Sequence, residues 1–244
     1  MFDKKNYVLN CDICDARKMK EEDYKVVKHN SLVNAKGKYQ YSVNQLKLIC
    51  HLIANIKPNE QDFETKYIAL KELGFVGENS ENYTYFKEEF VRLLEMPFKI
   101  PNSKYWVNWF SALAFENGVI EYRFDPALKP FLLNLKENFT SYHLSNVMNL
   151  KSNYAILTFE LLAQARNQGY RNITIKEYRE LLKIPDSYLN ADILRLLKKV
   201  QKEIKDRTNL QFNFAFKKMG KSFHSINFVI LNNKKVAGVT YDCI

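Results

Sequence analysis

The chain has 244 residues, of which 46% are hydrophobic and 14% aromatic. This length suits two domains of about 120 residues each, and this composition excludes an intrinsically disordered protein. No apolar run approaches the roughly 18 residues that span a bilayer, and the first segment, MFDKKNYVLNCD, lacks the apolar centre of a signal peptide. We therefore expect a cytoplasmic protein without a membrane partner.

The net charge of +10 is unevenly distributed along the chain. Residues 1–150 hold 20 Lys and Arg against 19 Asp and Glu, whereas residues 151–244 hold 17 against 8. A positive field concentrated in one part of a chain is typical of a surface that binds a polyanion such as nucleic acid. A solvated, lysine-rich face has the same composition, so charge alone leaves both interpretations open.

The sequence of the first 150 residues predicts a polar arm, three helices, a short strand and a β-hairpin. The arm covers residues 1–24, which are charged and aperiodic. Ser42 and Gln45 have the spacing of a capping box, and Asn117-Gly118 is a strong signal for a tight hairpin turn. The predicted elements, in order, are a helix from Ser42 that ends before Pro58, a short strand at 63–66, a helix near 69–73 ended by Gly74, a helix from about Tyr83 to Leu94, and a hairpin over residues 107–124.

The same order of elements recurs after residue 150. These elements are a helix at 152–168, a strand at 173–175, a helix at 176–182 with a capping box of Thr174 and Glu177, a helix at 190–207, and a hairpin over residues 212–230. This is the order of a winged helix, in which the third helix usually reads a groove and the hairpin is the wing. We predict an α+β protein with two tandem winged-helix domains.

The domain boundaries follow from this repeat. The N-terminal winged helix is expected at residues 25–146 and takes part in DNA binding. The C-terminal winged helix is expected at residues 147–233, and it is expected to do most of the DNA binding because it carries the positive charge. Residues 234–244 are left as a tail.

The helix at 190–207 is the most informative segment. At about 100° per residue, its apolar residues fall on one side and its basic residues on the other. The apolar side holds Ile193, Leu197, Val200 and Ile204, and the basic side holds Arg195, Lys198, Lys199, Lys202 and Lys205. Surface helices with outward lysines are common, but this one precedes a wing with further lysines, so one domain can touch a major groove and the neighbouring phosphates. The wing lysines are Lys217, Lys218 and Lys221.

Two other places hold candidate DNA-binding residues. The start of the helix at 152–168 offers backbone amides, a hydroxyl and a lysine to a phosphate oxygen, although an ordinary helix cap fits the sequence equally well. Its residues are Lys151, Ser152, Asn153 and Tyr154. The third helix of the first half adds Tyr83, Tyr85, Lys87 and Arg92. Nearby glutamates dilute its charge, so we expect weaker phosphate contact there.

Motifs for other chemistries are incomplete. Cys11 and Cys14 form half of a zinc site, but the nearest completing ligands, His29 and the Cys50-His51 pair, are irregularly spaced, so incidental cysteines are the favoured interpretation. Gly220-Lys221-Ser222 lacks the first glycine of a P-loop and precedes a predicted strand. No His-x-His is present, so the metal motif of a rolling-circle nicking enzyme is missing. We expect no metal, no cofactor and no catalytic residue.

Three strings resemble a known family, the iteron-binding plasmid replication initiators, which are theta-type Rep proteins with tandem winged helices. The strings are VVKHNSLVNA at 26–35, the segment 107–162 with FTSYHL and LKSNYAI, and KKMGKSFHSINFVI at 217–230. The resemblance runs from about residue 26 to residue 232, and the arm with Cys11 and Cys14 lies outside it.

The resemblance implies a function for the whole chain. Monomers bind directly repeated origin sites in double-stranded DNA, the iterons, and open adjacent AT-rich DNA with the host replication initiator and the replicative helicase. Dimers, joined through the first winged helix, bind an operator inverted repeat and repress the protein's own gene. The family has no catalytic activity, so the protein is not expected to be an enzyme. The alternative is a winged-helix transcription regulator without a replication role.

Overall fold

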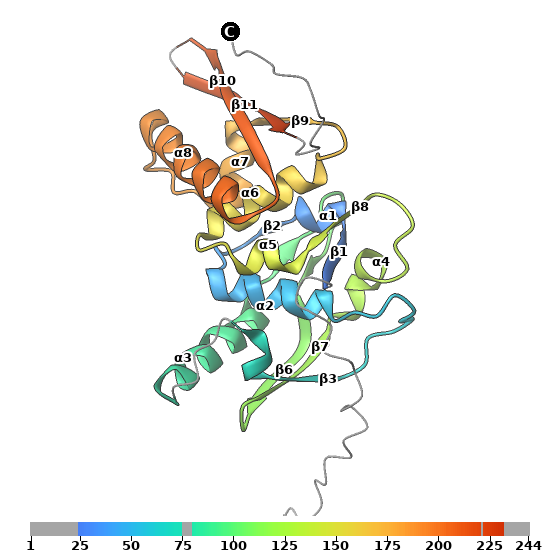
Figure 1. Ribbon diagram of the computed structural model, residues 1–244. Coiled ribbons are helices and arrows are strands. Elements are labelled where there is room, and N and C mark those ends of the chain that lie inside the picture. The colour runs from blue at the N-terminus through green and yellow to red at the C-terminus, as the bar shows by residue number, and fades with distance from the viewer. Residues whose placement is uncertain (1–23, 75–79, 221, 232–244) are drawn as a thin grey trace, which may run out of the picture.

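The computed structural model describes residues 24–74, 80–220 and 222–231. Two halves are stacked on each other, and the three helices of a winged helix occur in the same order in each, with additional short helices in the first (Figure 1). In the first half these are α2 (Val43–Ala54), the 3-10 helix η2 (Leu70–Leu73), and α3 (Ser80–Val91) with its 3-10 continuation η3 (Arg92–Glu95). In the second half they are α6 (Asn153–Gln164), α7 (Ile175–Leu182) and α8 (Asn190–Arg207).

Each half also contains a three-stranded antiparallel sheet of the same topology. The first consists of β3 (Lys66–Ala69), β6 (Phe110–Glu116) and β7 (Val119–Phe124), in the order β3-β7-β6. The second consists of β9 (Tyr170–Thr174), β10 (Gln211–Met219) and β11 (Ser222–Leu231), in the order β10-β11-β9. In both halves the strand before the second helix pairs with the second hairpin strand. The prediction of two tandem winged helices in an α+β protein is therefore confirmed.

Local sequence signals account for the best-predicted boundaries. Ser42 caps α2 in a complete capping box with Gln45, so two backbone donors at the helix start are satisfied. Asn117 (φ 51°) and Gly118 (φ 78°) both have positive φ, as the tight turn of a twisted hairpin requires. The helix of residues 190–207 was predicted with the bounds that α8 has.

Nine short elements lie outside the predicted pattern, because each is too brief to show a periodicity. They are β1 (Lys25–His29), α1 (Asn30–Val33), β2 (Lys36–Gly37), β4 (Phe98–Lys99), β5 (Trp106–Val107), η4 (Pro126–Leu128), α4 (Lys129–Leu132), β8 (Phe139–His143) and α5 (Leu144–Met148). β1 pairs with β8, and β2, β4 and β5 form a small sheet in the order β2-β4-β5.

Several predicted boundaries were wrong. The hairpin expected from Val107 begins at Phe110, because Val107 lies in β5 and pairs with Phe98 of another sheet. The strand expected at 173–175 is β9, which begins at Tyr170, and the helix expected from about Tyr83 begins at Ser80. The helix expected at 152–168 ends at Gln164, because the chain then turns, with Gly169 at a φ of 77°, into strand β9. The strand expected at 63–66 is β3, which begins only at Lys66, because Phe63 packs its ring 5.3 Å from that of Phe124 instead of extending the strand. Residues 1–23 of the expected arm and all of the expected tail, 234–244, lie outside the described residues.

A single apolar core runs through both halves. Helix α6 is at its centre, because it contacts α1, α2 and β8 of the first half and α7 and α8 of the second. Its Ile156, Phe159 and Leu162 side chains are at most 1% exposed. The division at residues 146 and 147 stays a prediction, and the helix just after it packs against both halves. No helix in the described part of the chain is long and apolar enough to cross a membrane.

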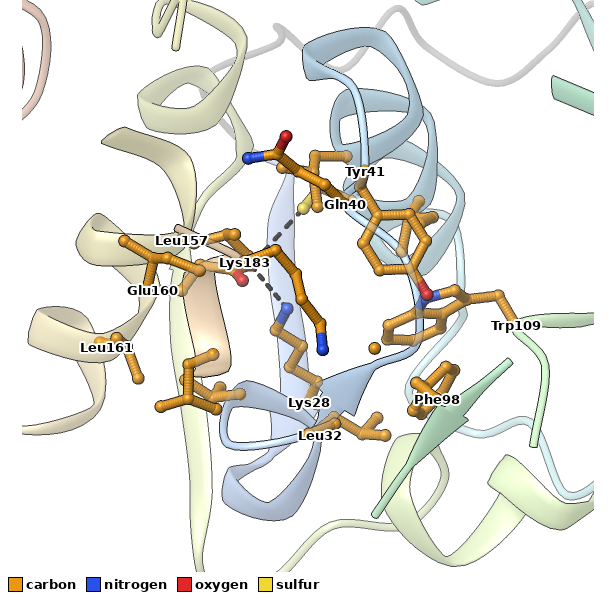
Figure 2. Close-up of a pocket in the computed structure, with 18 of the residues that line it drawn as sticks. Lys28, Leu32, Gln40, Tyr41, Phe98, Trp109, Leu157, Glu160, Leu161 and Lys183 are labelled. Atoms are coloured by element: carbon orange, nitrogen blue, oxygen red, sulfur yellow. Dashed lines mark hydrogen bonds and ion pairs between the residues drawn. The ribbon is translucent and has the colours of Figure 1, made fainter. Parts of the chain in front are cut away.

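A buried ion pair joins the two halves inside this core. Lys28 Nζ of β1 lies 2.5 Å from Glu160 Oε1 of α6, and the Tyr142 hydroxyl donates to the same oxygen. Figure 2 shows the pair in the wall of a cavity of about 50 Å³ between the halves. Burial acts to lower the pKa of Lys28, but the charge and hydrogen bond of Glu160 and the electrostatic effect of Cys50 together outweigh it, so the pKa of Lys28 lies above its usual value. The lysine is therefore charged at neutral pH.

Candidate nucleic-acid interface

Helix α8 separates its apolar and basic residues as predicted. The four apolar residues are at most 1% exposed, and they pack α8 onto α6 and β10. All five basic residues of the opposite side are exposed. These basic residues, which we call the α8 basic face, are Arg195, Lys198, Lys199, Lys202 and Lys205. The helix therefore presents a cationic surface held rigidly by the core beneath it.

The first turn of α8 is ordered by one carboxylate. Asp192 Oδ2 accepts the backbone N–H of Leu189 at 2.9 Å, and Asp192 Oδ1 lies 3.1 Å from Nη2 of Arg195. Arg195 Nε also donates to the Ala191 carbonyl at 3.4 Å, although the Arg195 side chain is 72% exposed. The guanidinium is thus held near the helix start, where it can offer its planar edge to a guanine.

The wing extends beside this helix. Lys217 and Lys218 are exposed on β10, and Lys218 Nζ lies 5.9 Å from the centroid of the Phe223 ring. The Phe223 ring stacks on Phe216 of the opposing strand with centroids 3.8 Å apart, which stiffens the hairpin near its tip. Lys221, the third predicted wing lysine, lies outside the described residues. Contact between the wing lysines and DNA phosphates stays a prediction.

The start of α6 is tied to α8 by Glu203. Its Oε1 accepts the backbone N–H groups of Lys151 at 2.5 Å and Ser152 at 3.0 Å, so these two amides already have an anionic partner. The Ser152 side chain makes no capping bond, and the Asn153 amide donates to the Tyr41 carbonyl of the first half at 3.1 Å. Of this group Lys151 is exposed, while Ser152, Asn153 and Tyr154 are half-buried. Their contact with phosphate stays a prediction.

The same device occurs in the first half. Glu89 of α3 is 8% exposed, and its carboxylate accepts from the Ser42 hydroxyl and, at 3.1 Å, from the Asn44 amide at the start of α2. In each half, therefore, a carboxylate of the third helix binds the start of the first helix. The glutamates of this helix were expected only to dilute its charge, and Glu203 and Asp192 were given no role. The spacing Leu189-Asp192-Arg195, three residues apart each, was the available signal for the Asp192 contacts.

The third helix of the first half has a mixed surface. Tyr85 is 59% exposed, and Lys87 and Arg92 are exposed as well. Glu88 and Glu95 are exposed among them, so no α3 counterpart of the α8 basic face exists in the described residues. The side chain of Tyr83 lies outside the described residues. The structure thus places Tyr85 and Lys87 on α3 and Arg92 on its continuation η3, and their DNA contacts stay predictions.

The structure describes part of the zinc site and of the P-loop that the sequence analysis considered. Cys50 is buried, and burial raises the pKa of its thiol to about 12, so it is a poor metal ligand. No group of three or more His, Cys, Asp or Glu that could hold a metal occurs within residues 24–74, 80–220 and 222–231. Cys11 and Cys14 lie outside these ranges. The segment after Gly220 continues as strand β11, whereas a P-loop requires a helix there.

Two family comparisons match the chain in agreement with this geometry. The family described as initiator replication protein, WH1, matches residues 25–163, and the family described as initiator Rep protein, WH2, matches residues 174–230. The first match alone covers more than half of the chain. The two winged helices, the cationic third helix of the second and these matches lead to one conclusion: the chain belongs to the initiator Rep family of DNA-binding plasmid replication initiators with tandem winged helices.

Proposed function

We propose that the protein initiates theta replication of its plasmid by binding, as a monomer, to directly repeated iterons at the origin. The observation that carries this proposal is the α8 basic face, with Arg195 held at the helix start by Asp192 and the wing beside it. Lysines along the helix suit phosphates, which give affinity, whereas an ordered arginine suits a guanine edge, which gives sequence preference.

The first winged helix adds a second, weaker contact. Helices α3 and α8 lie on the same side of the molecule in Figure 1, one in each half. A duplex laid along that side meets both third helices in succession, and the exposed Lys87 and Arg92 then supply fewer phosphate contacts than α8 does. The N-terminal half therefore extends the binding site, and the C-terminal half supplies most of the affinity.

The bound protein opens adjacent AT-rich DNA together with the host replication initiator and the replicative helicase. Winged helices of this family bind DNA and are not catalytic, so the chemistry of unwinding belongs to the host proteins. The protein itself acts without a cofactor and without a catalytic residue.

A dimer of the same chain represses its own gene at an operator inverted repeat. Strand β6 lies at one edge of the sheet of the first half, because the sheet order is β3-β7-β6. Such an edge offers a breakable interface between two copies. Light scattering across protein concentration, with and without operator DNA, tests this part, and a monomer under all conditions would contradict it.

Footprinting on the DNA that flanks the gene tests the main proposal. Protection of several direct repeats, each by one monomer, is the expected result. Protection of a single inverted repeat and nothing else would favour the alternative, a transcription regulator without a replication role. A matched comparison uses duplexes with the repeat and with the same bases scrambled, titrated over a range of salt concentrations.

A further inference from the structure

The cavity between the two halves has mostly apolar walls and two lysines. Its volume is about 50 Å³, and residues of both halves line it. Figure 2 shows the side chains of Lys28, from β1, and Lys183, at the end of α7, extending into this space. Tyr41 and Trp109 form one wall, and Leu157 of α6 lies on the opposite side. Two ammonium groups from different halves therefore share one largely apolar space.

The charge of the Lys28 ammonium is already balanced. Glu160 Oε1 lies 2.5 Å from Lys28 Nζ. Two other titratable groups of the walls are neutral at pH 7, because burial raises the pKa of the Cys50 thiol to about 12 and raises the pKa of the Tyr41 hydroxyl above its usual value. The net charge of the cavity therefore depends on Lys183.

Lys183 adds a positive charge that forms no ion pair in the described part of the chain. Within residues 24–74, 80–220 and 222–231, its ammonium has neither a hydrogen-bond acceptor nor a carboxylate within ion-pair distance. Glu180, three residues earlier, interacts with Lys183 electrostatically but forms its ion pair with Lys36, at 2.5 Å. Lys183 is also half-buried. The cavity thus has one positive charge in excess.

The backbone at Lys183 indicates that this residue is present for its side chain. Lys183 follows the last turn of α7 with φ 55° and ψ 42°, in the left-handed region. The other non-glycine residues with positive φ in the described ranges are all asparagines, which adopt this region more readily: Asn102, Asn117, Asn134 and Asn138. A glycine or an asparagine would end the helix at a lower cost in stability. A lysine at this position suits a ligand better than it suits the helix end.

A small monoanion with an apolar part fits these walls. One negative charge matches the one positive charge in excess, and the surrounding leucines and aromatic rings suit a methyl or methylene group. Inorganic phosphate has no apolar part and more charge than the cavity balances. One water needs about 10–15 Å³ of such a cavity, so about 50 Å³ takes roughly four heavy atoms. Acetate has this size.

We propose that the cavity binds a short-chain carboxylate of the size of acetate. The carboxylate accepts hydrogen bonds from the ammonium of Lys183 and from the donors of Lys28 that Glu160 does not use, and the methyl group packs against Trp109. Such an anion contacts both halves, so it stabilises the arrangement in which they are packed together. No α8 residue within the described ranges lines the cavity, so the site is separate from the α8 basic face. This role goes beyond DNA binding, because it makes the packing of the two halves depend on a small organic anion.

The fluorescence of Trp109 tests the proposal in the full chain. Trp109 lines the cavity and is 6% exposed, and it is the only tryptophan left in Trp106→Phe. We expect a saturable change on titration with sodium acetate at constant ionic strength. Acetamide has the same size without the charge and should cause no such change. A ligand of four heavy atoms binds no more tightly than about 40 µM, so the titration extends to about 30 mM.

Lys183→Asn separates the role of the side chain from that of the backbone. Asparagine adopts the left-handed conformation readily, so without acetate this variant should melt at the temperature of the parent chain or above it. It should nevertheless bind acetate about tenfold more weakly or worse, because a charged hydrogen-bond donor is lost. The matched control is Lys176→Gln, which removes an exposed charge from the same helix and should bind acetate like the parent chain.

Thermal melts provide a second measurement. At ten times the Kd, acetate should raise the midpoint of the parent chain by about 3–6 °C, since it binds the folded state alone. The rise should vanish in Lys183→Asn and persist in Lys176→Gln. A rise that persists in Lys183→Asn would be a general salt effect and would contradict the proposal.

Three fluorescence results would also overturn it. A signal that never saturates would mean that the cavity holds water only, an equal response to acetamide would remove the charge as the cause, and equal losses in Lys183→Asn and Lys176→Gln would assign the effect to the overall charge of the surface. Failure of the proposed function is a separate outcome, because it would appear in footprinting on the flanking DNA, which is carried out without acetate.

Discussion

Helices α3 and α8 hold the same place in two halves of the same topology, yet their surfaces differ. α8 exposes five basic residues on one face, whereas α3 and its continuation expose Lys87 and Arg92 among Glu88 and Glu95. Both helices use a carboxylate, Glu89 or Glu203, to bind the start of the first helix of their half. The winged-helix framework is thus maintained by the same kind of contact in both halves, while the strength of phosphate binding depends on side chains that the framework does not constrain.

The comparison of α3 with α8 assumes that the two halves fold as one body. The buried Lys28–Glu160 ion pair joins them, so removing it tests this assumption. Glu160→Ala leaves the Lys28 ammonium in the core without its partner, so we expect a loss of about 3–5 kcal/mol in the free energy of unfolding. Urea unfolding followed by circular dichroism measures it. The double variant Lys28→Met with Glu160→Leu removes both charges and should recover most of the loss. Equal stability of Glu160→Ala and the parent chain would show that the pair does not hold the halves together.

Acid should weaken the shared core through His51. His51 of α2 is 9% exposed, and burial lowers its pKa to about 4, below the value of about 6.5 in an unfolded chain. The unfolded chain therefore binds more protons, so this contribution to stability is complete above about pH 6.5 and is lost progressively as the pH falls to about 4. The difference between the two pKa values corresponds to about 3 kcal/mol.

His51→Gln tests this pH dependence. Helix α6, the counterpart of α2 in the second half, carries no histidine, so the two first helices differ in this group. Thermal melts from pH 7 to pH 4 should show a shallower fall in stability for the variant than for the parent chain. Identical slopes would remove His51 as the cause.

Base reading and phosphate binding can be separated within α8. Arg195→Ala should weaken binding to the cognate repeat by about 1–3 kcal/mol and relax the preference at one base position, because the guanidinium held by Asp192 is lost. Titration on repeat and scrambled duplexes measures both effects. Equal losses on the two duplexes would assign Arg195 to phosphate contact and leave the α8 basic face without a reading residue.

The parts of the fold that could be predicted from the sequence have a periodic pattern of apolar residues, a helix cap or a strong turn signal. The apolar and basic sides of α8, the Ser42 capping box and the Asn117-Gly118 turn are all local patterns, and the structure has each of them. The strands β1, β2, β4 and β8 were missed, and Val107 of β5 was wrongly assigned to the hairpin, because two to five residues carry no period.

The contacts that order the site were harder to predict than its charges. Exposed lysines could be assigned from the helical periodicity, since a cationic face is a property of one helix. Glu203 binds amides more than 50 residues away, and Lys28 meets Glu160 across 132 positions, so both contacts depend on tertiary packing. The row of Lys36, Lys99 and Trp106 likewise arises from strands that only the folded chain brings together.

A matched pair of substitutions compares how strongly the third helix of each half contacts DNA phosphates. Lys202 of α8 and Lys87 of α3 are both exposed lysines on a third helix. Each phosphate contact changes the slope of log K against log salt by about one unit, because bound counterions are released. Lys202→Gln should therefore reduce the slope by about one on repeat and scrambled duplexes alike. Lys87→Gln should change it by less, since Glu88 beside it already opposes the phosphate charge. A larger change for Lys87→Gln would mean that the first half dominates phosphate binding, and the charge difference between α3 and α8 would then be a poor guide to their roles.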